Sequence, residues 1–279
     1  MAYLSVAEIA KRWGVSERTV RNYCAAGKIP GAFLTGKTWN VPDNVQRPKR
    51  VNQKADVPKT LLDILRAEKN GGIKGGIYHK VQIELTYNSN HIEGSRLTHD
   101  QTRYIYETNT IGMEGGAVNV DDVVETANHF KCIDLVIEQA RQPVSESFIK
   151  LLHRTLKSGT SDSRKSWFAV GEYKKLPNEV GGRETTAPED VAKDVRQLLE
   201  SYNLQKEKCF EEIIAFHVAF ERIHPFQDGN GRVGRLILFK ECLRNDIVPF
   251  IIDEDLKMFY YRGLHEWSSE QGYLLDTCR

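Results

Sequence analysis

Residues 224–235 read His-Pro-Phe-Gln-Asp-Gly-Asn-Gly-Arg-Val-Gly-Arg, and they join two segments whose apolar residues recur with helical spacing. The first helix should end before Pro225, because the residue ahead of a proline is pushed out of the α region. A second apolar helix begins at Gly231, directly after the glycines. The stretch therefore predicts a loop between two helices, within a chain whose pattern after residue 58 is almost wholly helical.

The loop has the composition of an anion site. Glycines let backbone N–H groups turn toward one point, and a helix start adds unpaired donors and a positive dipole end. Arg232 and Arg235 lie three residues apart on one helical side and can bind phosphate oxygens in pairs. Asp228 is a hard oxygen ligand that suits Mg²⁺ bound together with phosphates. His224 can take a proton from an attacking hydroxyl near neutral pH.

Each of these residues has an ordinary structural explanation when it is taken singly. A histidine before a proline usually ends a helix, and Gly-Asn-Gly alone is usually a turn. That explanation must place a base, an acid and two arginines around one turn by chance. The combination favours a site for a polyphosphate.

The stretch resembles the signature of the Fic family, protein AMPylators that move AMP from ATP to a hydroxyl side chain. The matching positions are His224, Phe226, Asp228, Gly229, Asn230, Gly231, Arg232 and Arg235. The resemblance spans residues 59–279 and implies a mostly helical Fic fold. It implies that His224 is the general base and that Asp228 holds Mg²⁺. It also implies that the backbone of 229–231, the Phe226 and Asn230 positions, and both arginines bind ATP. The family's Doc kinases carry Lys where Gly231 stands, which favours AMP transfer here.

Residues 89–94, Ser-Asn-His-Ile-Glu-Gly, resemble the inhibitory motif that some Fic proteins carry ahead of the catalytic loop. Its residues here are Ser89, Glu93 and Gly94. The resemblance implies that Glu93 reaches Arg235 and fills the space that the γ-phosphate of ATP needs, so that ATP binds misplaced for in-line attack. In the alternative, Glu93 ends a helix and faces solvent. The same glutamate could position a water for de-AMPylation.

Two further stretches resemble parts of the family. Residues 170–182 are similar to the Fic flap, a hairpin on which a target segment docks as an added strand. Its expected docking residues are Tyr173, Lys174 and Gly181, and Lys174 stands where many members have Arg. The alternative is that residues 170–182 form a plain surface hairpin.

Residues 258–264 resemble the family helix whose second tyrosine borders the adenine of ATP. Here that tyrosine is Tyr261. The alternative is that Tyr261 is an ordinary core residue.

The first 50 residues carry nine Lys and Arg against three Asp and Glu, although the whole chain has a net charge of only +1. Their pattern predicts two capped helices and a hairpin over 1–46, which resembles the winged helix-turn-helix of excisionase and MerR-type DNA-binding domains. The expected DNA contacts are Arg18, Arg21, Lys28 and Lys37. A domain used for protein contacts is the alternative. Residues 47–58 lack periodicity and predict a linker to the 59–279 domain.

Composition excludes several other classes. No apolar run approaches the roughly 20 residues of a membrane span, and we expect no secretory leader. The five cysteines form no CxxC pair, which predicts reduced thiols in the cytoplasm and neither disulfides nor a zinc site.

Helical spacing predicts nine helices after the linker, with caps at Thr98 and Thr186. Their ranges are Thr60–Lys69, Ile77–Ile92, His99–Asn109, Asp121–Ala140, Glu146–Lys157, Pro188–Tyr202, Glu211–Ile223, Gly231–Asn245 and Asp255–Ser268.

The sequence thus predicts a cytoplasmic, ATP- and Mg²⁺-dependent protein adenylyltransferase that is inhibited by Glu93 and carries a DNA-binding head. The alternative is a DNA-binding transcriptional regulator whose Fic domain senses nucleotide without turnover; His224 argues against it, because a sensor needs no base. Transfer of another phosphate-linked group, such as UMP, is a further alternative. The target protein, its acceptor (Tyr, Thr or Ser) and the oligomeric state are left open.

Overall fold

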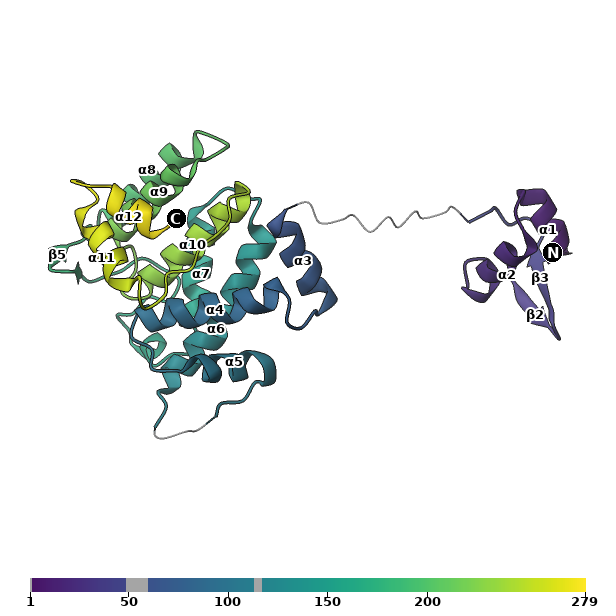
Figure 1. Cartoon of the computed structure of the whole chain (residues 1–279), viewed down its shortest axis with the longest axis horizontal. Coiled ribbons are helices and arrows are strands. Elements are labelled where there is room, and N and C mark those ends of the chain that lie inside the picture. Colours follow the sequence, from purple (N-terminus) through teal and green to yellow (C-terminus); the bar gives the residue numbers. More distant parts are fainter. Residues whose placement is uncertain (1, 49–59, 113–116) are drawn as a thin grey trace. The chain divides into compact units, whose positions relative to one another are not determined.

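The computed structural model describes residues 2–48, 60–112 and 117–279. The chain divides into two compact units, Met1–Val57 and Pro58–Arg279 (Figure 1). The predicted linker 47–58 lies, apart from its first two residues, outside the described residues. None of the helices in the described ranges combines the length and the apolar character that a bilayer crossing requires.

The first unit is a helical pair on a three-stranded antiparallel sheet of order β1-β3-β2. The side chain of Ser5 caps the first helix, and the Ser5 backbone N–H donates to the Glu8 carboxylate at 2.8 Å. Ile9, Val20 and Val41 are fully buried between helices and sheet. The elements are β1 (Tyr3–Ser5), α1 (Val6–Trp13), α2 (Glu17–Ala25), β2 (Phe33–Thr35) and β3 (Thr38–Pro42).

The second unit is helical, with one two-stranded hairpin. Its elements are α3 (Leu61–Gly71), α4 (Ile77–Ile92), α5 (His99–Thr108), α6 (Val120–Gln139), α7 (Glu146–Lys157), the 3₁₀ turn η1 (Asp162–Arg164), β4 (Glu179–Val180), β5 (Arg183–Glu184), α8 (Val191–Asn203), α9 (Phe210–Ile223), α10 (Asn230–Arg244), α11 (Lys257–Glu266) and α12 (Gly272–Thr277). The prediction of a mostly α-helical protein with small β elements is confirmed.

Helix α10 is the centre of this unit. Every residue from Arg232 to Leu243 is buried, because α4, α6, α7 and α9 pack around the helix (Figure 1). A helix that is covered on all sides is typical of a domain core. The two arginines of the 224–235 loop therefore project from a rigid, enclosed element.

The predicted boundaries differ from the structure chiefly around α8. Thr186 does not cap it: the helix begins at Val191, and the Thr186 hydroxyl instead donates to Asp194 Oδ2 at 3.0 Å. The residues between them form a turn, in which the Asp190 N–H donates to Ala187 O at 2.9 Å. The Thr98 cap is present, with the Gln101 N–H donating to Thr98 Oγ1 at 3.1 Å. Strand β1 and helix α12 were not predicted, since three and six residues are too short to show periodicity.

Candidate functional site

His224 stands at a strained position between α9 and the loop. Its backbone lies in the left-handed region (φ 50°, ψ 62°), which costs a non-glycine residue on the order of 1–3 kcal/mol. Its N–H still donates to Phe220 O at 3.0 Å, and Pro225 then stops the helix. The imidazole Nδ1 is buried without a hydrogen-bond partner. Burial lowers the pKa of His224 to about 4, so the ring is neutral at pH 7 and can accept a proton.

Two signature residues brace the loop from inside. The Asn230 side chain accepts a hydrogen bond from the Phe226 N–H and donates one to Phe226 O, both at 2.8 Å. The Phe226 ring is fully buried and stacks on His153, with centroids 3.9 Å apart. The Phe226 side chain is covered by the core, and the amide of Asn230 is used by the loop backbone. ATP binding at these two positions stays a prediction, and it would involve their backbone.

The start of α10 approaches Glu93 closely. Gly229 takes a left-handed conformation (φ 79°) just before the helix, and its carbonyl accepts from the Val233 N–H at 3.0 Å. At Gly231 a Cβ would lie 2.3 Å from Glu93 Oε1, so any side chain there would displace the Glu93 carboxylate. The first N–H groups of a helix have no partner inside it. They are thus the donors that the 229–231 backbone offers to an anion.

The predicted inhibitory residues meet Arg235. Its guanidinium donates to Glu93 Oε1 at 2.7 Å, to Ser89 O at 2.8 Å and to Ser89 Oγ at 3.0 Å. Burial lowers the pKa of Arg235, but Glu93 outweighs burial and the net shift is upward. Glu93 follows the last residue of α4, and Gly94 (φ 96°) turns the chain away. Glu93 thus ends α4, and its side chain, which is 26% exposed, turns its carboxylate to Arg235.

Asp228 belongs to a second charge network. Its Oδ2 accepts from Lys157 Nζ at 2.6 Å and from Arg232 Nη2 at 3.3 Å. Lys157 and Arg232 both also contact Glu125. Burial raises the pKa of Asp228, but the two cations outweigh it and lower the pKa to about 2. The carboxylate is therefore ionised at any physiological pH.

The donor set can be tested against Mg²⁺. Within the described ranges, no group of three or more His, Cys, Asp or Glu side chains could hold a metal ion. Asp228 offers an ionised carboxylate, and its contacts with Lys157 and Arg232 are made through Oδ2. Mg²⁺ commonly binds one carboxylate together with substrate phosphates and water. The residues fit a metal that arrives with the nucleotide.

The flap residues are placed differently from the prediction. Strands β4 and β5 form a short exposed hairpin around Gly181 and Gly182. Tyr173 and Lys174 lie before it and point inward: Tyr173 packs beside Phe226, with centroids 5.9 Å apart, and Lys174 is 3% exposed. The Lys174 side chain is buried and that of Tyr173 is partly buried, so a target strand would meet the backbone of the flap; docking at these positions stays a prediction. Gly181 is exposed at the tip.

Tyr261 lies beside the inhibitory residues. Its ring is 40% exposed, and its hydroxyl donates to Ile92 O, the residue before Glu93, at 3.3 Å. The preceding Tyr260 is a core residue with a 2.7 Å hydrogen bond to His217. Of the paired tyrosines, only Tyr261 can face a ligand.

Comparison with known proteins identifies both units. The Fic/DOC family profile matches residues 143–241, and a helix-turn-helix domain profile matches residues 3–42. The chain contains a Fic domain preceded by a helix-turn-helix domain. Protein adenylyltransferase Fic of Aedes aegypti is 27% identical over 224 residues, which cover 77% of this chain and 42% of that protein. Protein adenylyltransferase Fic of Nematostella vectensis is 27% identical over 225 residues, which cover 78% of this chain and 49% of that protein. The chain thus spans about half the length of the curated relatives it matches.

A solved structure agrees with this assignment. A Fic domain containing signaling protein from Bacteroides thetaiotaomicron is 28% identical, with a TM-score of 0.62, over 78% of this chain and 85% of that one. A match over 78% of the chain extends well beyond the 224–235 loop. The Fic fold is therefore common to both proteins.

Two charged residues of the Fic domain site were missed from the sequence. Glu125 and Lys157 lie on α6 and α7, far in the chain from the 224–235 loop. For Lys157 a signal existed: it falls on the apolar face of α7 with Ile149, Leu152 and Leu156, and it is 2% exposed. A lysine on a buried stripe requires an acidic partner, which only the fold could name.

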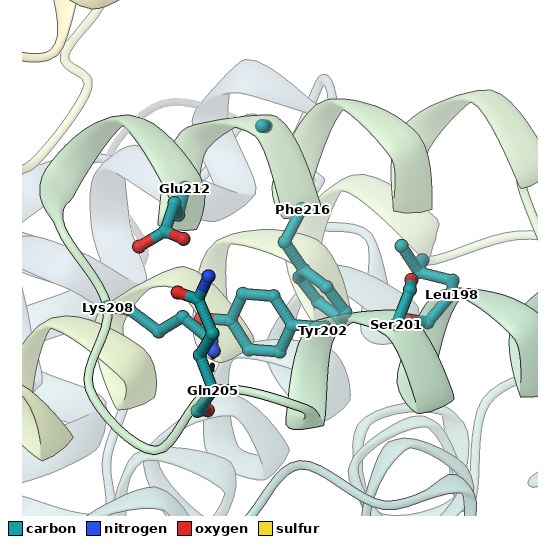
Figure 2. Close-up of a pocket in the computed structure, with 8 residues that line it drawn as sticks. Leu198, Ser201, Tyr202, Gln205, Lys208, Glu212 and Phe216 are labelled. Atoms are coloured by element: carbon teal, nitrogen blue, oxygen red, sulfur yellow. Dashed lines mark hydrogen bonds between the residues drawn. The ribbon is translucent and has the colours of Figure 1, made fainter.

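A pocket of about 280 Å³ lies elsewhere on the Fic domain, between α8 and α9 (Figure 2). Its polar groups are engaged, since Lys208 Nζ donates to Gln205 O at 2.5 Å and the Tyr202 hydroxyl to Glu241 Oε2 at 3.1 Å. It contains none of the predicted site residues. The lining residues are Leu198, Ser201, Tyr202, Gln205, Lys208, Glu212, Ala215 and Phe216.

In the helix-turn-helix domain, the predicted DNA contacts are all exposed. Arg21 forms an ion pair with Glu17 at 2.6 Å. The four are Arg18, Arg21, Lys28 and Lys37.

Proposed function

We propose that the Fic domain is a protein adenylyltransferase that moves AMP from ATP to a Tyr, Thr or Ser hydroxyl of a target protein. One observation carries the proposal: a neutral His224 stands beside a glycine-lined helix start whose helix bears Arg232 and Arg235. The relatives named protein adenylyltransferase Fic support the same reaction class.

The chemical roles follow from this arrangement. The target's hydroxyl oxygen attacks the α-phosphorus of ATP, the bond from that phosphorus to the bridging oxygen breaks, and pyrophosphate leaves. His224 accepts the hydroxyl proton. The unpaired N–H groups at the start of α10 and the arginines bind the phosphates. Mg²⁺, held by Asp228, would neutralise phosphate charge.

We propose further that Glu93 inhibits this reaction in the resting protein. Its carboxylate occupies Arg235, the group that would orient the γ-phosphate, and lies against the Gly231 backbone. A triphosphate must displace this carboxylate or bind in a shifted position, where in-line attack fails. De-AMPylation by a water held at Glu93 is a related outcome of the same geometry.

Labelled ATP tests both proposals. Glu93→Gly should transfer label to itself or to lysate proteins much faster than the unchanged protein. Glu189→Gly, which removes an exposed glutamate from a turn, is the charge-matched control and should behave like the unchanged protein. Adding His224→Ala to Glu93→Gly should abolish transfer but keep nucleotide binding. Equal labelling by Glu93→Gly and the unchanged protein would refute the inhibition. Transfer that persists without His224 would refute the assigned base.

A second candidate function rests on the helix-turn-helix domain. Residues 3–42 match that profile, and the first 50 residues carry a net charge of +6. We propose that the exposed cations contact DNA phosphates, which makes affinity fall as salt rises. Fluorescence anisotropy with double-stranded DNA at several salt concentrations tests this, with Arg18→Ala and Lys28→Ala reducing the salt slope. Absence of binding at low salt would refute it. If His224→Ala regulates transcription as the unchanged protein does, the alternative of a transcriptional regulator with a nucleotide-sensing Fic domain is favoured.

A further inference from the structure

Lys174 closes the base of the flap. Its ammonium donates to Asn178 Oδ1 at 2.7 Å and to Thr185 Oγ1 at 2.5 Å. Asn178 precedes β4 and Thr185 follows β5, so one cation ties both ends of the hairpin together. The Thr185 hydroxyl also donates to Asn178 O at 3.0 Å, which completes the closure.

The same lysine holds the chain on both sides of His224. Its Nζ lies 3.5 Å from Ile223 O, and its backbone N–H donates to Pro225 O at 2.9 Å. The Asn178 amide adds a 3.1 Å hydrogen bond to Phe226 O. Because His224 has a left-handed backbone, its conformation persists only if neighbouring contacts impose it. These contacts come from the base of the flap.

Burial makes this arrangement costly for a surface hairpin. Lys174 is 3% exposed, and burial lowers the pKa of its ammonium to about 8. A buried cation is tolerated only when its hydrogen bonds are satisfied. All three of its oxygen acceptors belong either to the flap or to the residue before His224.

We propose that Lys174 is a positioning residue that couples the docking of a target strand on the flap to the backbone conformation of His224. The inference rests on the proposed adenylyl transfer. A target that pairs with β4 or β5 orders the segment between Asn178 and Thr185, and Lys174 transmits that order to residues 223–225. Lys174 itself touches neither the nucleotide nor the target.

Charge supplies a readout that a purely structural role would not move. Burial is the largest cause of the lowered pKa of His224, and Lys174 lowers it further. The Glu93 and Asp228 carboxylates and the nearby backbone of Glu221 act in the opposite direction. Removing the Lys174 charge should therefore raise the pKa of His224.

The experiment compares three variants in the Glu93→Gly background. Lys174→Met removes the cation, Lys174→Arg keeps it, and Lys175→Met is the matched control at an exposed neighbour. The probe is self-labelling at saturating ATP and Mg²⁺. Lys174→Met should slow labelling about tenfold to a hundredfold, the range for a misplaced catalytic group, with ATP affinity unchanged by calorimetry. The acid limb of its pH–rate profile should move to higher pH. Lys174→Arg should restore the limb and most of the rate, and Lys175→Met should match the parent.

Other outcomes overturn the inference. If Lys174→Met labels itself as fast as an active Glu93→Gly parent, Lys174 does not position His224 and the inference is wrong. If Lys174→Met loses ATP affinity as well as labelling rate, the substitution damages the fold in general and the specific role of Lys174 is refuted. If Lys174→Met fails to fold, Thr185→Val deletes one acceptor and should slow labelling several-fold. Amide hydrogen exchange at 223–226 gives a readout without transfer: it should accelerate in Lys174→Met, and unchanged exchange would contradict the inference. A parent that does not label at all refutes the proposed function, whereas the exchange result still decides the role of Lys174.

Discussion

Glu93→Gln should lower the stability of the ligand-free protein and raise its affinity for ATP, but not its affinity for ADP. The substitution keeps the shape of the side chain and removes the charge that pairs with Arg235 at 2.7 Å. Breaking a buried ion pair by removing one partner costs about 3–5 kcal/mol. Glu93 is 26% exposed and Arg235 keeps its two hydrogen bonds to Ser89, so we expect a smaller loss of about 1–2 kcal/mol in the free energy of unfolding.

Thermal unfolding and calorimetric titration measure the two halves of this prediction. For a domain of this size, each kcal/mol shifts Tm by about 2–4 °C, so the variant should unfold about 2–8 °C lower. In the unchanged protein, the γ-phosphate must displace Glu93 from Arg235, and breaking that ion pair costs free energy. The variant has no such ion pair to break. ATP affinity should therefore rise about tenfold, the equivalent of about 1.4 kcal/mol. ADP lacks the γ-phosphate and should bind both proteins alike.

The control is Glu200→Gln, which removes the charge of an exposed glutamate on α8. It should leave Tm and both affinities unchanged. The reasoning is refuted if Glu93→Gln is as stable as the unchanged protein, or if ADP gains as much affinity as ATP. Equal gains would mean that Glu93 opposes the shared phosphates and not the terminal one.

Three further predictions concern the same unit. Burial lowers the pKa values of His129 and His217 to about 3, so each stays neutral in the folded protein while the unfolded chain takes up protons below about pH 6.5. The contribution of these two histidines to stability should be constant above that pH and fall by about 1.4 kcal/mol per histidine per pH unit below it, and His129→Gln should reduce the slope of urea midpoints against pH in that range. Phe226→Ala empties a fully buried, stacked position and should cost about 3–5 kcal/mol in urea unfolding; a cost below about 1 kcal/mol would contradict the anchoring role. Tyr261→Phe removes only the hydroxyl that donates to Ile92 O, so basal self-labelling should rise modestly while ATP affinity is kept; an unchanged rate would show that this contact does not hold Glu93 in place.

Much of the helical unit was predictable because its signals are local. The bounds of α4 and α7 match the predicted ranges. Helix α7 has a sustained apolar face, whereas the buried face of α4 mixes apolar residues with Gln82, Thr86, Ser89 and Asn90. The break at Pro225 and the helix start after Gly229 follow from the backbone preferences of proline and glycine. The start of α8 was wrong, because a turn after Thr186 uses the same residue types as a helix cap.

The site was predictable only where one segment supplied it. The 224–235 loop contains the histidine, the acid and both arginines within twelve residues, so their proximity follows from chain connectivity. The inward turn of Lys174 was not predictable, because a lysine in a polar hairpin is ordinarily exposed. Its burial depends on oxygens of the loop against which the flap packs.

The sequence alone determined where the helices break, how they are capped and which loop bears the reactive groups, because these depend on residues within about four positions of one another. Tertiary structure decided which charges meet. Glu93 and Arg235 are 142 residues apart, and Lys157 and Asp228 are 71 apart. Each pair forms because α4 and α7 pack against α10, which buries the Arg235 guanidinium and the Lys157 ammonium, and a buried cation must find a partner or lose stability.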